Sequence, residues 1–272
     1  MYAFTLERPA NAVDAAKLAA AGAKPLAGGQ TLLAAMKLRL SSPGQLADLS
    51  GIQALAGIRR EGNAFVIGAM TRHADVAINA ELKAALPALA GLAAHIGDRQ
   101  VRAMGTLGGS VANNDPAACY PSAVLALGAT IHTTMRKIAA DDFFLGMFAT
   151  ALNEGELITA ISFPTPRRAA YMKFKQPASR FALVGVFIAQ FDAGVRVAVT
   201  GAANGVFRHK GLEEALNQRF TPQAAAAVKI DASALNSDIH ATAAYRANLI
   251  SVLTQRGVTQ ALGQASVGLS KI

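Results

Sequence analysis

The stretch TLGGSVANNDPAACYP, residues 106–121, places small and hydrogen-bonding residues directly before the apolar run at 123–127. Glycine allows positive φ angles, and its missing Cβ lets a ligand approach the backbone closely. Backbone N–H groups at the start of a helix have no partner inside the helix and attract anions. The stretch therefore predicts either a tight turn or a backbone that lies against an anionic ligand.

A second glycine pair lies in AGGQT, residues 27–31, again after apolar residues and before a stretch compatible with a helix. Two such loops could hold a pyrophosphate from two sides, with the hydroxyls of Thr31, Thr106 and Ser110 as further donors. Neither loop matches the G-x-G-x-x-G fingerprint or the P-loop. Because Gly-Gly turns are common, the spacing alone leaves both interpretations open, a plain turn and a phosphate-bearing ligand.

Composition narrows the class of protein. The chain has 272 residues, 52% of them hydrophobic, which is enough for a sizeable core and two or three subdomains. The longest strongly apolar stretch, 181–191, is too short to span a bilayer and is typical of a buried strand. Residues 1–12 lack the basic and apolar regions of a secretory signal. We therefore expect a cytoplasmic protein without a transmembrane segment.

Cysteine and charge exclude further classes. Cys119 is the only cysteine, so an internal disulfide is impossible, and this chain alone would not hold an iron–sulfur cluster or a structural zinc. His73 and His95 have no neighbour at metal-ligand spacing, so we assign no metal site. The net charge is +9, but the basic residues are scattered and aromatic residues are only 6% of the chain. This pattern predicts a basic surface rather than nucleic-acid binding.

Capping and periodicity signals predict a mixture of short helices and strands. Asn11 and Gly22 would cap one helix, Pro87 would kink or break another, and Gly257 would end the last. The prolines of PTPRR, 164–168, mark a boundary, and 181–200 form a hairpin. We expect strands at 24–26, 45–50, 64–70, 129–135, 157–163, 181–191 and 195–200, and helices at 12–21, from 31 onward, and at 75–78, 82–96, 121–127, 211–217, 222–228 and 240–256.

Five ordered motifs resemble one known family. They are AGGQTLLAAMKLRL, VIGAMTRHADV, VRAMGTLGGSVANNDPAACYPSAVLALGA, GELITAISFP and YMKFKQ. In this order they resemble the FAD-binding medium subunit of molybdenum hydroxylases, the carbon monoxide dehydrogenase and xanthine dehydrogenase group, over nearly the whole chain. The resemblance implies an α+β protein. It would have a two-subdomain FAD-binding fold of the PCMH type (1–55 and 56–168) and a C-terminal domain with a small antiparallel sheet and helices (169–272).

The resemblance also implies which residues contact FAD. The two glycine loops would bind the pyrophosphate, and an aliphatic residue, a strand edge, a lysine and an aromatic residue would lie near the flavin. Core packing is an equally simple explanation for Leu157, Ile158 and Phe181, as is solvent exposure for Lys175. The implied contacts are Ala27, Gly28, Gly29, Gln30, Thr31, Leu32, Val101, Thr106, Leu107, Gly108, Gly109, Ser110, Asn114, Asp115, Cys119, Leu157, Ile158, Lys175 and Phe181.

One position departs from the family. Many relatives carry aspartate, which can accept hydrogen bonds from FAD hydroxyls, where this chain has Cys119. Cysteine is a weak acceptor. Either Asp115 or Asn114 takes over this role, or one hydrogen bond to FAD is missing.

The resemblance implies an electron-transfer subunit without catalytic residues of its own. A large subunit would hold the molybdenum cofactor and a small subunit two [2Fe–2S] clusters. FAD on this chain would pass electrons from those clusters to an external acceptor, and the complex would be a dimer of heterotrimers. Two alternatives stay open, a self-contained FAD oxidoreductase of the same superfamily and a flavin-free structural adaptor. Neither the substrate nor the acceptor can be inferred from this sequence.

Overall fold

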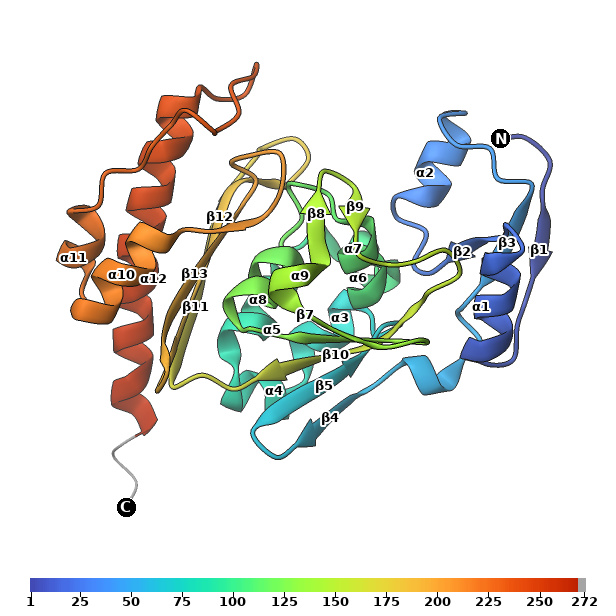
Figure 1. Cartoon of the computed structure of the whole chain (residues 1–272), viewed down its shortest axis with the longest axis horizontal. Coiled ribbons are helices and arrows are strands. Elements are labelled where there is room, and N and C mark those ends of the chain that lie inside the picture. The colour runs from blue at the N-terminus through green and yellow to red at the C-terminus, as the bar shows by residue number, and fades with distance from the viewer. Residues whose placement is uncertain (269–272) are drawn as a thin grey trace.

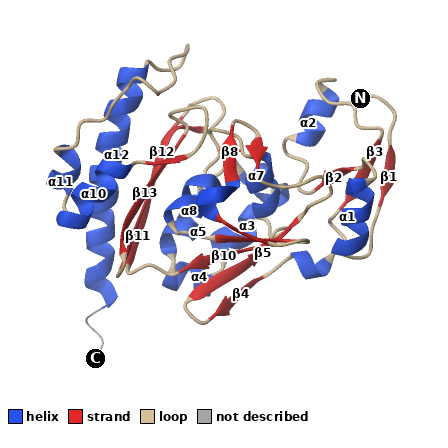
Figure 2. Ribbon diagram, viewed as in Figure 1, coloured by secondary structure: helices blue, strands red, loops and turns tan. Residues whose placement is uncertain are grey.

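The computed structural model describes residues 1–268, with side chains described as far as Gly263. Three sheets follow one another along the long axis of the molecule (Figures 1 and 2). The first is parallel, in the order β1-β3-β2. It consists of β1 (Thr5–Glu7), β2 (Lys24–Leu26) and β3 (Gln45–Asp48), accompanied by helices α1 (Ala12–Ala20) and α2 (Leu32–Lys37) and the 3-10 turn η1 (Gln53–Leu55).

The second sheet has five strands in the order β4-β5-β10-β6-β7. Its strands are β4 (Ile58–Glu61), β5 (Ala64–Gly68), β6 (Thr130–Thr133), β7 (Lys137–Ala139) and β10 (Ile158–Pro164), and a small hairpin is made of β8 (Phe144–Gly146) and β9 (Ala149–Thr150). The helices of this region are α3 (His73–Ile78), α4 (Ala80–Ala85), α5 (Pro87–Ala94), α6 (Arg99–Met104), α7 (Leu107–Asn113), α8 (Tyr120–Ala126) and α9 (Ala140–Phe143). Pro87 occupies the first turn of α5, so the expected break in 82–96 is confirmed.

The third sheet is antiparallel, in the order β11-β12-β13-β14, and helices cover its outer face (Figure 1). Its elements are β11 (Arg168–Lys175), β12 (Ala182–Phe191), β13 (Gly194–Thr200) and β14 (Phe207–Arg208), with helices α10 (Lys210–Gln218), α11 (Pro222–Ala226) and α12 (Ala243–Gly268). The hairpin expected at 181–200 is β12–β13. No helix within the described residues is long and apolar enough to cross a bilayer.

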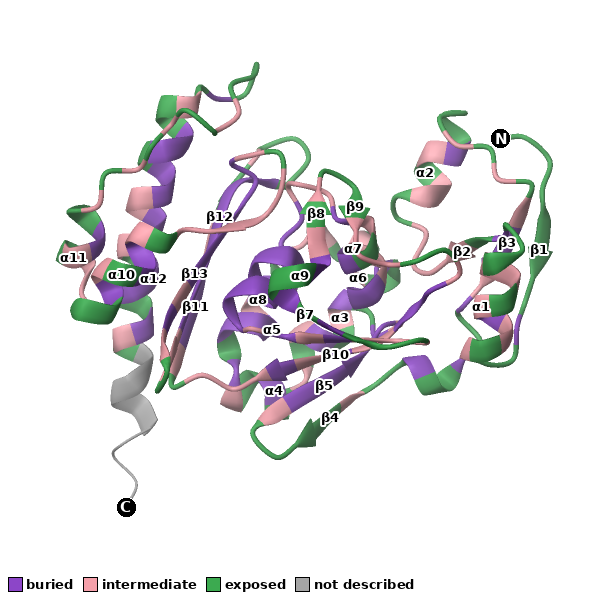
Figure 3. Ribbon diagram, viewed as in Figure 1, coloured by how far each residue is buried: buried purple, intermediate pink, exposed green. Residues whose placement is uncertain are grey.

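Strand β12 is apolar along its whole length because both of its faces are covered. Phe187 and Ala189 face the core shared with α5 and α8, whereas Val186 and Ile188 face the core shared with α10 and α12. Helix α8 lies between the second and third sheets and is entirely buried (Figure 3). The position of α8 matters for function, since the chain enters it directly from the stretch at 106–121.

Gly257 does not end the last helix, contrary to the prediction from sequence. Helix α12 continues through it to Gly268. A Cβ added at Gly257 would lie 2.8 Å from Ile188 Cδ1 and 3.2 Å from Met172 Cγ. The glycine therefore lets the helix lie close against the third sheet, a role that one sequence cannot distinguish from a helix stop.

This role of Gly257 can be tested against a second glycine inside a helix. We expect Gly257→Ala to lower the free energy of unfolding by about 1–3 kcal/mol, since the added methyl group overpacks the sheet contact. Gly91→Ala in α5 is the matched control, because no described atom lies within 4 Å of a Cβ added there. It should be neutral or stabilise by about 0.5–1 kcal/mol. Urea denaturation of both variants measures the difference, and equal stabilities would contradict the packing role.

Candidate functional site

The two glycine loops lie directly against each other. The first joins β2 to α2, and the second consists of Thr106, which caps α7, and the first turn of α7 itself. A Cβ added at Gly28 would collide with the carbonyl oxygen of Met104 and lie 2.7 Å from Gly105 Cα. A Cβ added at Gly109 would lie 3.3 Å from Ala27 Cβ. The fold thus joins segments that are nearly 80 positions apart in the chain into one backbone surface.

The first loop offers a row of free donors. Within residues 1–268, no carbonyl or side chain accepts a hydrogen bond from the backbone N–H groups of residues 28–32. Gly29 has a φ of +68°, a conformation that glycine adopts without strain. The hydroxyl of Thr31 also has no partner in the described chain. Successive N–H groups in such a turn form a concave site for an anion.

The second loop does not offer such donors, and here the expectation of outward N–H groups is wrong. Leu107 N–H donates to Thr71 O at 3.0 Å, and Gly108 N–H donates to Ala69 O at 2.8 Å. The next two N–H groups are bonded to Thr106 itself, through its Oγ1 and its carbonyl oxygen. What remains available is the hydroxyl of Ser110, which has no partner among the described residues.

Gly108 is needed for packing rather than for ligand approach. A Cβ at this position would lie 2.5 Å from Ala69 Cβ and 2.9 Å from Ala69 Cα. Leu107 is fully buried in the central core. The second loop therefore anchors α7 on β5 and supports the first loop from behind.

Asn114 and Asp115 use their side chains within the protein. Asn114 is 1% exposed, and its Nδ2 donates to Gly146 O (2.7 Å) and Ala149 O (2.8 Å). Asp115 Oδ1 accepts from Ala117 N–H at 2.8 Å. These contacts favour a supporting role for both residues, in which they fix the end of α7 and the β8–β9 hairpin.

Cys119 is a buried thiol in contact with an ammonium group. It is 5% exposed, and Lys173 Nζ lies 3.2 Å from its Sγ. The same Nζ donates to His95 O at 3.0 Å. Lys173 thereby ties the start of α8 and the end of α5 to β11. Sequence reasoning singled out Lys175 in this strand and missed Lys173, whose side chain lies on the same face of β11.

A cleft with strongly positive walls lies beside this contact. Its volume is about 350 Å³, and we call it the cationic cleft. Within the described residues, no carboxylate lies within 4 Å of its cations Arg102, Lys175 and Arg180. It is lined by Ala94, His95, Gly97, Arg102, Lys175, Gln176, Pro177 and Arg180.

The positive charges of the cleft also act on His95. Partial burial lowers the pKa of His95, and the nearby charges of Lys175, Lys173 and Arg102 lower it further, against a hydrogen bond to Gly91 O that raises it. A cleft with this charge favours an anionic group.

Helix α6 connects the cleft with the glycine loops. It begins after Gly97, which lines the cleft, and ends at Met104, which touches Gly28. Six residues of helix span about 9 Å. Val101 lies midway, and its side chain packs against Gly97. An extended ligand could reach from the first loop to the cleft along this helix.

The remaining candidate residues differ in exposure. Leu157 and Ile158 are 7% and 6% exposed and belong to two different cores. The bend before them is fixed by Glu156, which accepts from Arg136 and from Asn153 N–H. Phe181 is 47% exposed at the end of the loop that carries part of the cleft. Core packing thus suits Leu157 and Ile158 better than it suits Phe181.

His73 lies beneath the second loop, where its protonation should affect stability. It is 4% exposed, and burial lowers its pKa to about 4, with Arg102 as a second cause. Between pH 6.5 and 4 the unfolded chain takes up a proton here and the folded chain does not. The free energy of unfolding therefore decreases by roughly 3 kcal/mol because of His73 as the pH falls across that interval.

The test of this pH effect is a comparison with His73→Phe, which keeps an aromatic ring beside Tyr120. We expect the unfolding free energy of the variant to fall less between pH 6.5 and 4 than that of the wild type. Chemical denaturation at several pH values measures both curves. Parallel curves would show that His73 is not the group responsible.

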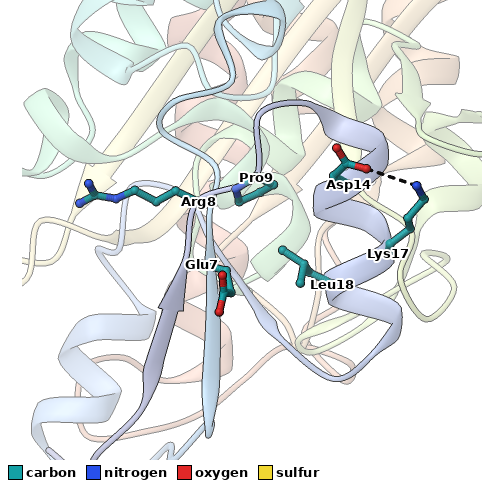
Figure 4. Close-up of a pocket in the computed structure, with 6 residues that line it drawn as sticks. All are labelled: Glu7, Arg8, Pro9, Asp14, Lys17 and Leu18. Carbon is teal, nitrogen blue, oxygen red and sulfur yellow. Dashed lines mark hydrogen bonds and ion pairs between the residues drawn. The ribbon is translucent and has the colours of Figure 1, made fainter.

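A second hollow lies near the N-terminus and differs from the cationic cleft in its charges (Figure 4). It is lined by Glu7, Arg8, Pro9, Asp14, Lys17 and Leu18. Three of its four charged residues are paired, since Asp14 pairs with Lys17 at 3.2 Å and Arg8 pairs with Asp48 at 3.5 Å. The hollow therefore has no concentration of unpaired positive charge like that of the cationic cleft.

Comparison with known proteins identifies the family. Residues 2–166 match the model of the FAD binding domain in molybdopterin dehydrogenase. This chain belongs to that family. It is similar to the carbon monoxide dehydrogenase medium chain of Afipia carboxidovorans, with 35% identity over 96% of this chain and 98% of the other. It is also similar to the nicotine 6-hydroxylase medium subunit of Paenarthrobacter nicotinovorans, with 34% identity over 93% and 95%.

Solved structures agree with this assignment. Reconstituted CO dehydrogenase from Oligotropha carboxidovorans has a chain that matches with a TM-score of 0.90 and 33% identity, over 97% of this chain and all of the other. Quinoline 2-oxidoreductase from Pseudomonas putida 86 matches with a TM-score of 0.89 and 27% identity, over 97% and 98%. The resemblance drawn from five motifs and the α+β fold class are therefore confirmed. This chain is therefore a flavoprotein subunit of an oxidoreductase, and FAD is its cofactor.

Proposed function

We propose that this chain is the electron-transfer subunit of a molybdenum hydroxylase. FAD would take electrons from iron–sulfur clusters of a partner subunit and pass them to an external acceptor. The observation that carries the proposal is the row of free N–H groups at 28–32, joined by α6 to the cationic cleft. One end of this path suits a pyrophosphate, and the other suits a ring system that gains negative charge on reduction.

In this proposal FAD lies extended along α6. Residues 27–32 would hold the pyrophosphate, with the hydroxyls of Thr31 and Ser110 as further donors. Thr106, Leu107, Gly108, Gly109, Asn114 and Asp115 would hold the shape of the site from behind. Bound FAD supplies the redox chemistry, since a flavin accepts electrons singly and releases them in pairs, while the protein supplies position and charge.

At the cleft end, the residues proposed to lie near the flavin are Val101, Lys175 and Phe181. Arg102 and Arg180 add positive charge there, which favours the reduced, more negative cofactor. Leu157 and Ile158 would form the apolar wall towards β10. Cys119, held by Lys173, would not replace a carboxylate as a strong acceptor.

In the proposed complex, partner subunits hold the iron–sulfur clusters and the molybdenum cofactor. With one cysteine in the sequence, the chain cannot hold [2Fe–2S] clusters, so these belong on a small partner subunit and the molybdenum cofactor on a large one. We propose a cytoplasmic dimer of heterotrimers. Within the chain we propose FAD-binding subdomains at 1–55 and 56–168 and a third domain at 169–272.

The test is an absorption spectrum of the purified complex, before and after addition of FAD, with the released cofactor identified by mass. We expect flavin bands and one FAD per copy of this chain. A complex that contains all partner subunits but binds no flavin, even with added FAD, would reject the proposal. It would leave a structural adaptor as the better account.

A further inference from the structure

One lysine of β11, Lys173, directs its ammonium group to the wall of the cationic cleft. The neighbouring residues Met172 and Phe174 face the opposite side of the strand, where they pack against the α12 core and against Tyr245. Lys173 Nζ instead donates to His95 O at 3.0 Å, and His95 lines the cleft. The ammonium group therefore lies between β11, the end of α5 and the start of α8.

No carboxylate among the described residues compensates the charge of Lys173. Its other contact is Cys119 Sγ at 3.2 Å, and a thiol with its ordinary pKa is mostly uncharged near pH 7. The lysines that do pair with a carboxylate in the described part of the chain are Lys17 and Lys210, and both of these side chains are exposed. Lys173 therefore brings an uncompensated positive charge to a half-buried position.

The position of this charge lets it act on a ligand in the cleft. Water and salt screen exposed charges such as those of Lys175 and Arg180, but they screen a half-buried charge less. Lys173 is also held in place by its two contacts. Its effect is visible at His95, where the charge of Lys173 is one of the causes that lower the pKa of the imidazole. The same field favours negative charge on a ring system in the cleft.

We propose that Lys173 raises the reduction potential of FAD, and that Cys119 leaves this effect uncompensated because it contributes no negative charge. The inference rests on the proposed function, which places the flavin in the cleft. Two-electron reduction adds negative charge to a flavin, so a fixed cation nearby stabilises the reduced form more than the oxidised form. At an effective dielectric constant of about 20, one charge about 10 Å away changes such an equilibrium constant by roughly tenfold.

The first test is a redox titration of FAD in the purified complex with variants of Lys173. Lys173→Met should keep one FAD per chain and make reduction about tenfold less favourable, which is about 30 mV for a two-electron couple. Lys173→Arg keeps the charge and should restore the equilibrium constant to within about threefold of the wild type. Lys17→Met is the matched control, because it removes the same charge from an exposed pair in α1 and should leave the potential unchanged.

Cys119 provides a second test in which Lys173 stays in place. Because Cys119 Sγ lies 3.2 Å from Lys173 Nζ, a carboxylate at this position would pair with the ammonium group. Cys119→Asp should therefore lower the potential in the same direction as Lys173→Met, whereas Cys119→Ser, which adds no charge, should keep the wild-type potential. If Lys173→Met fails to fold, the two variants of Cys119 decide the question.

A third readout does not depend on FAD. Since the charge of Lys173 contributes to the low pKa of His95, Lys173→Met should raise that pKa in the full chain, and Lys173→Arg should keep it low. An NMR titration of the His95 signal measures both variants. An unchanged pKa of His95 in Lys173→Met would show that the charge does not reach the cleft, and it would overturn the inference.

Salt separates Lys173 from the exposed cations of the cleft. The shift in potential caused by Arg180→Gln should shrink as salt is added, whereas the shift caused by Lys173→Met should persist. A wild-type potential in Lys173→Met or in Cys119→Asp, with FAD bound, would overturn the inference. An equal shift in Lys173→Arg or in Cys119→Ser would also overturn it, because geometry rather than charge would then be responsible. A wild-type complex without FAD would instead reject the proposed function.

Discussion

Gly28→Val should abolish FAD binding and destabilise the protein by more than about 3 kcal/mol. The added Cβ would collide with Met104 O and lie 2.7 Å from Gly105 Cα, and these are backbone atoms that cannot rotate away. The first loop would have to move off the second, and the free N–H groups at 28–32 would lose their common direction. The ratio of flavin absorbance to protein and a denaturation curve measure both effects.

Two further glycines provide controls for this variant. Gly44→Val adds the same group where no described atom lies within 4 Å of the new Cβ, and it should keep FAD. Gly109→Ala brings a Cβ to 2.9 Å from Thr106 Oγ1, a side-chain atom, so it should weaken FAD binding less than Gly28→Val. If Gly28→Val bound FAD at full stoichiometry, the contact between the two loops would not be what shapes the site.

Local signals in the sequence predicted the elements that depend on near neighbours. Asn11 was expected to cap the first helix, and its Oδ1 accepts from Asp14 N–H at 2.9 Å. The strand at 24–26 was predicted with its observed bounds. The hairpin at 181–200 was predicted because two apolar runs flank a short turn, and β12 and β13 pair in that way. In each case the residues that decide the structure lie within a few positions of one another.

Features that depend on distant contacts could not be predicted. Strand β11 was missed because its alternating cations, Lys173 and Lys175, do not look like core, although Lys173 turns inward to Cys119. The donors of the second loop were misjudged because their acceptors, Ala69 O and Thr71 O, lie over 30 positions earlier. One sequence does not indicate which residues that are far apart in the chain come into contact in the fold.

The cationic cleft could not be predicted from the sequence for the same reason. His95 and Arg102 come from the second region, and Arg180 comes from a loop of the third. The one signal that could have suggested a site is that no acidic residue lies near Arg180 or Lys175 in the stretch 168–181. That signal indicates unpaired positive charge, but it does not indicate which other cations join it.

Asn114→Ala should lower the free energy of unfolding by roughly 3–5 kcal/mol. Asn114 has a φ of +45°, and its Nδ2 donates to both Gly146 O and Ala149 O. Alanine would remove two hydrogen bonds, at about 1 kcal/mol each, and would strain the backbone by roughly a further 1–3 kcal/mol. Asn114→Gly separates these causes, since glycine keeps the backbone conformation and loses only the hydrogen bonds.

The pair of variants also distinguishes a supporting residue from a FAD contact. If Asn114 acts by fixing α7 and the β8–β9 hairpin, Asn114→Gly should keep one FAD per chain at saturating cofactor, with a lower melting temperature. Its affinity for FAD should change by less than about tenfold, which is 1.4 kcal/mol. If the variant kept its melting temperature and lost FAD, the side chain would have to bind the cofactor directly. The side-chain amide of Asn114 is 1% exposed and donates both of its hydrogens to the hairpin. To reach FAD it would have to turn away from the hairpin and give up these bonds. We therefore expect the first result.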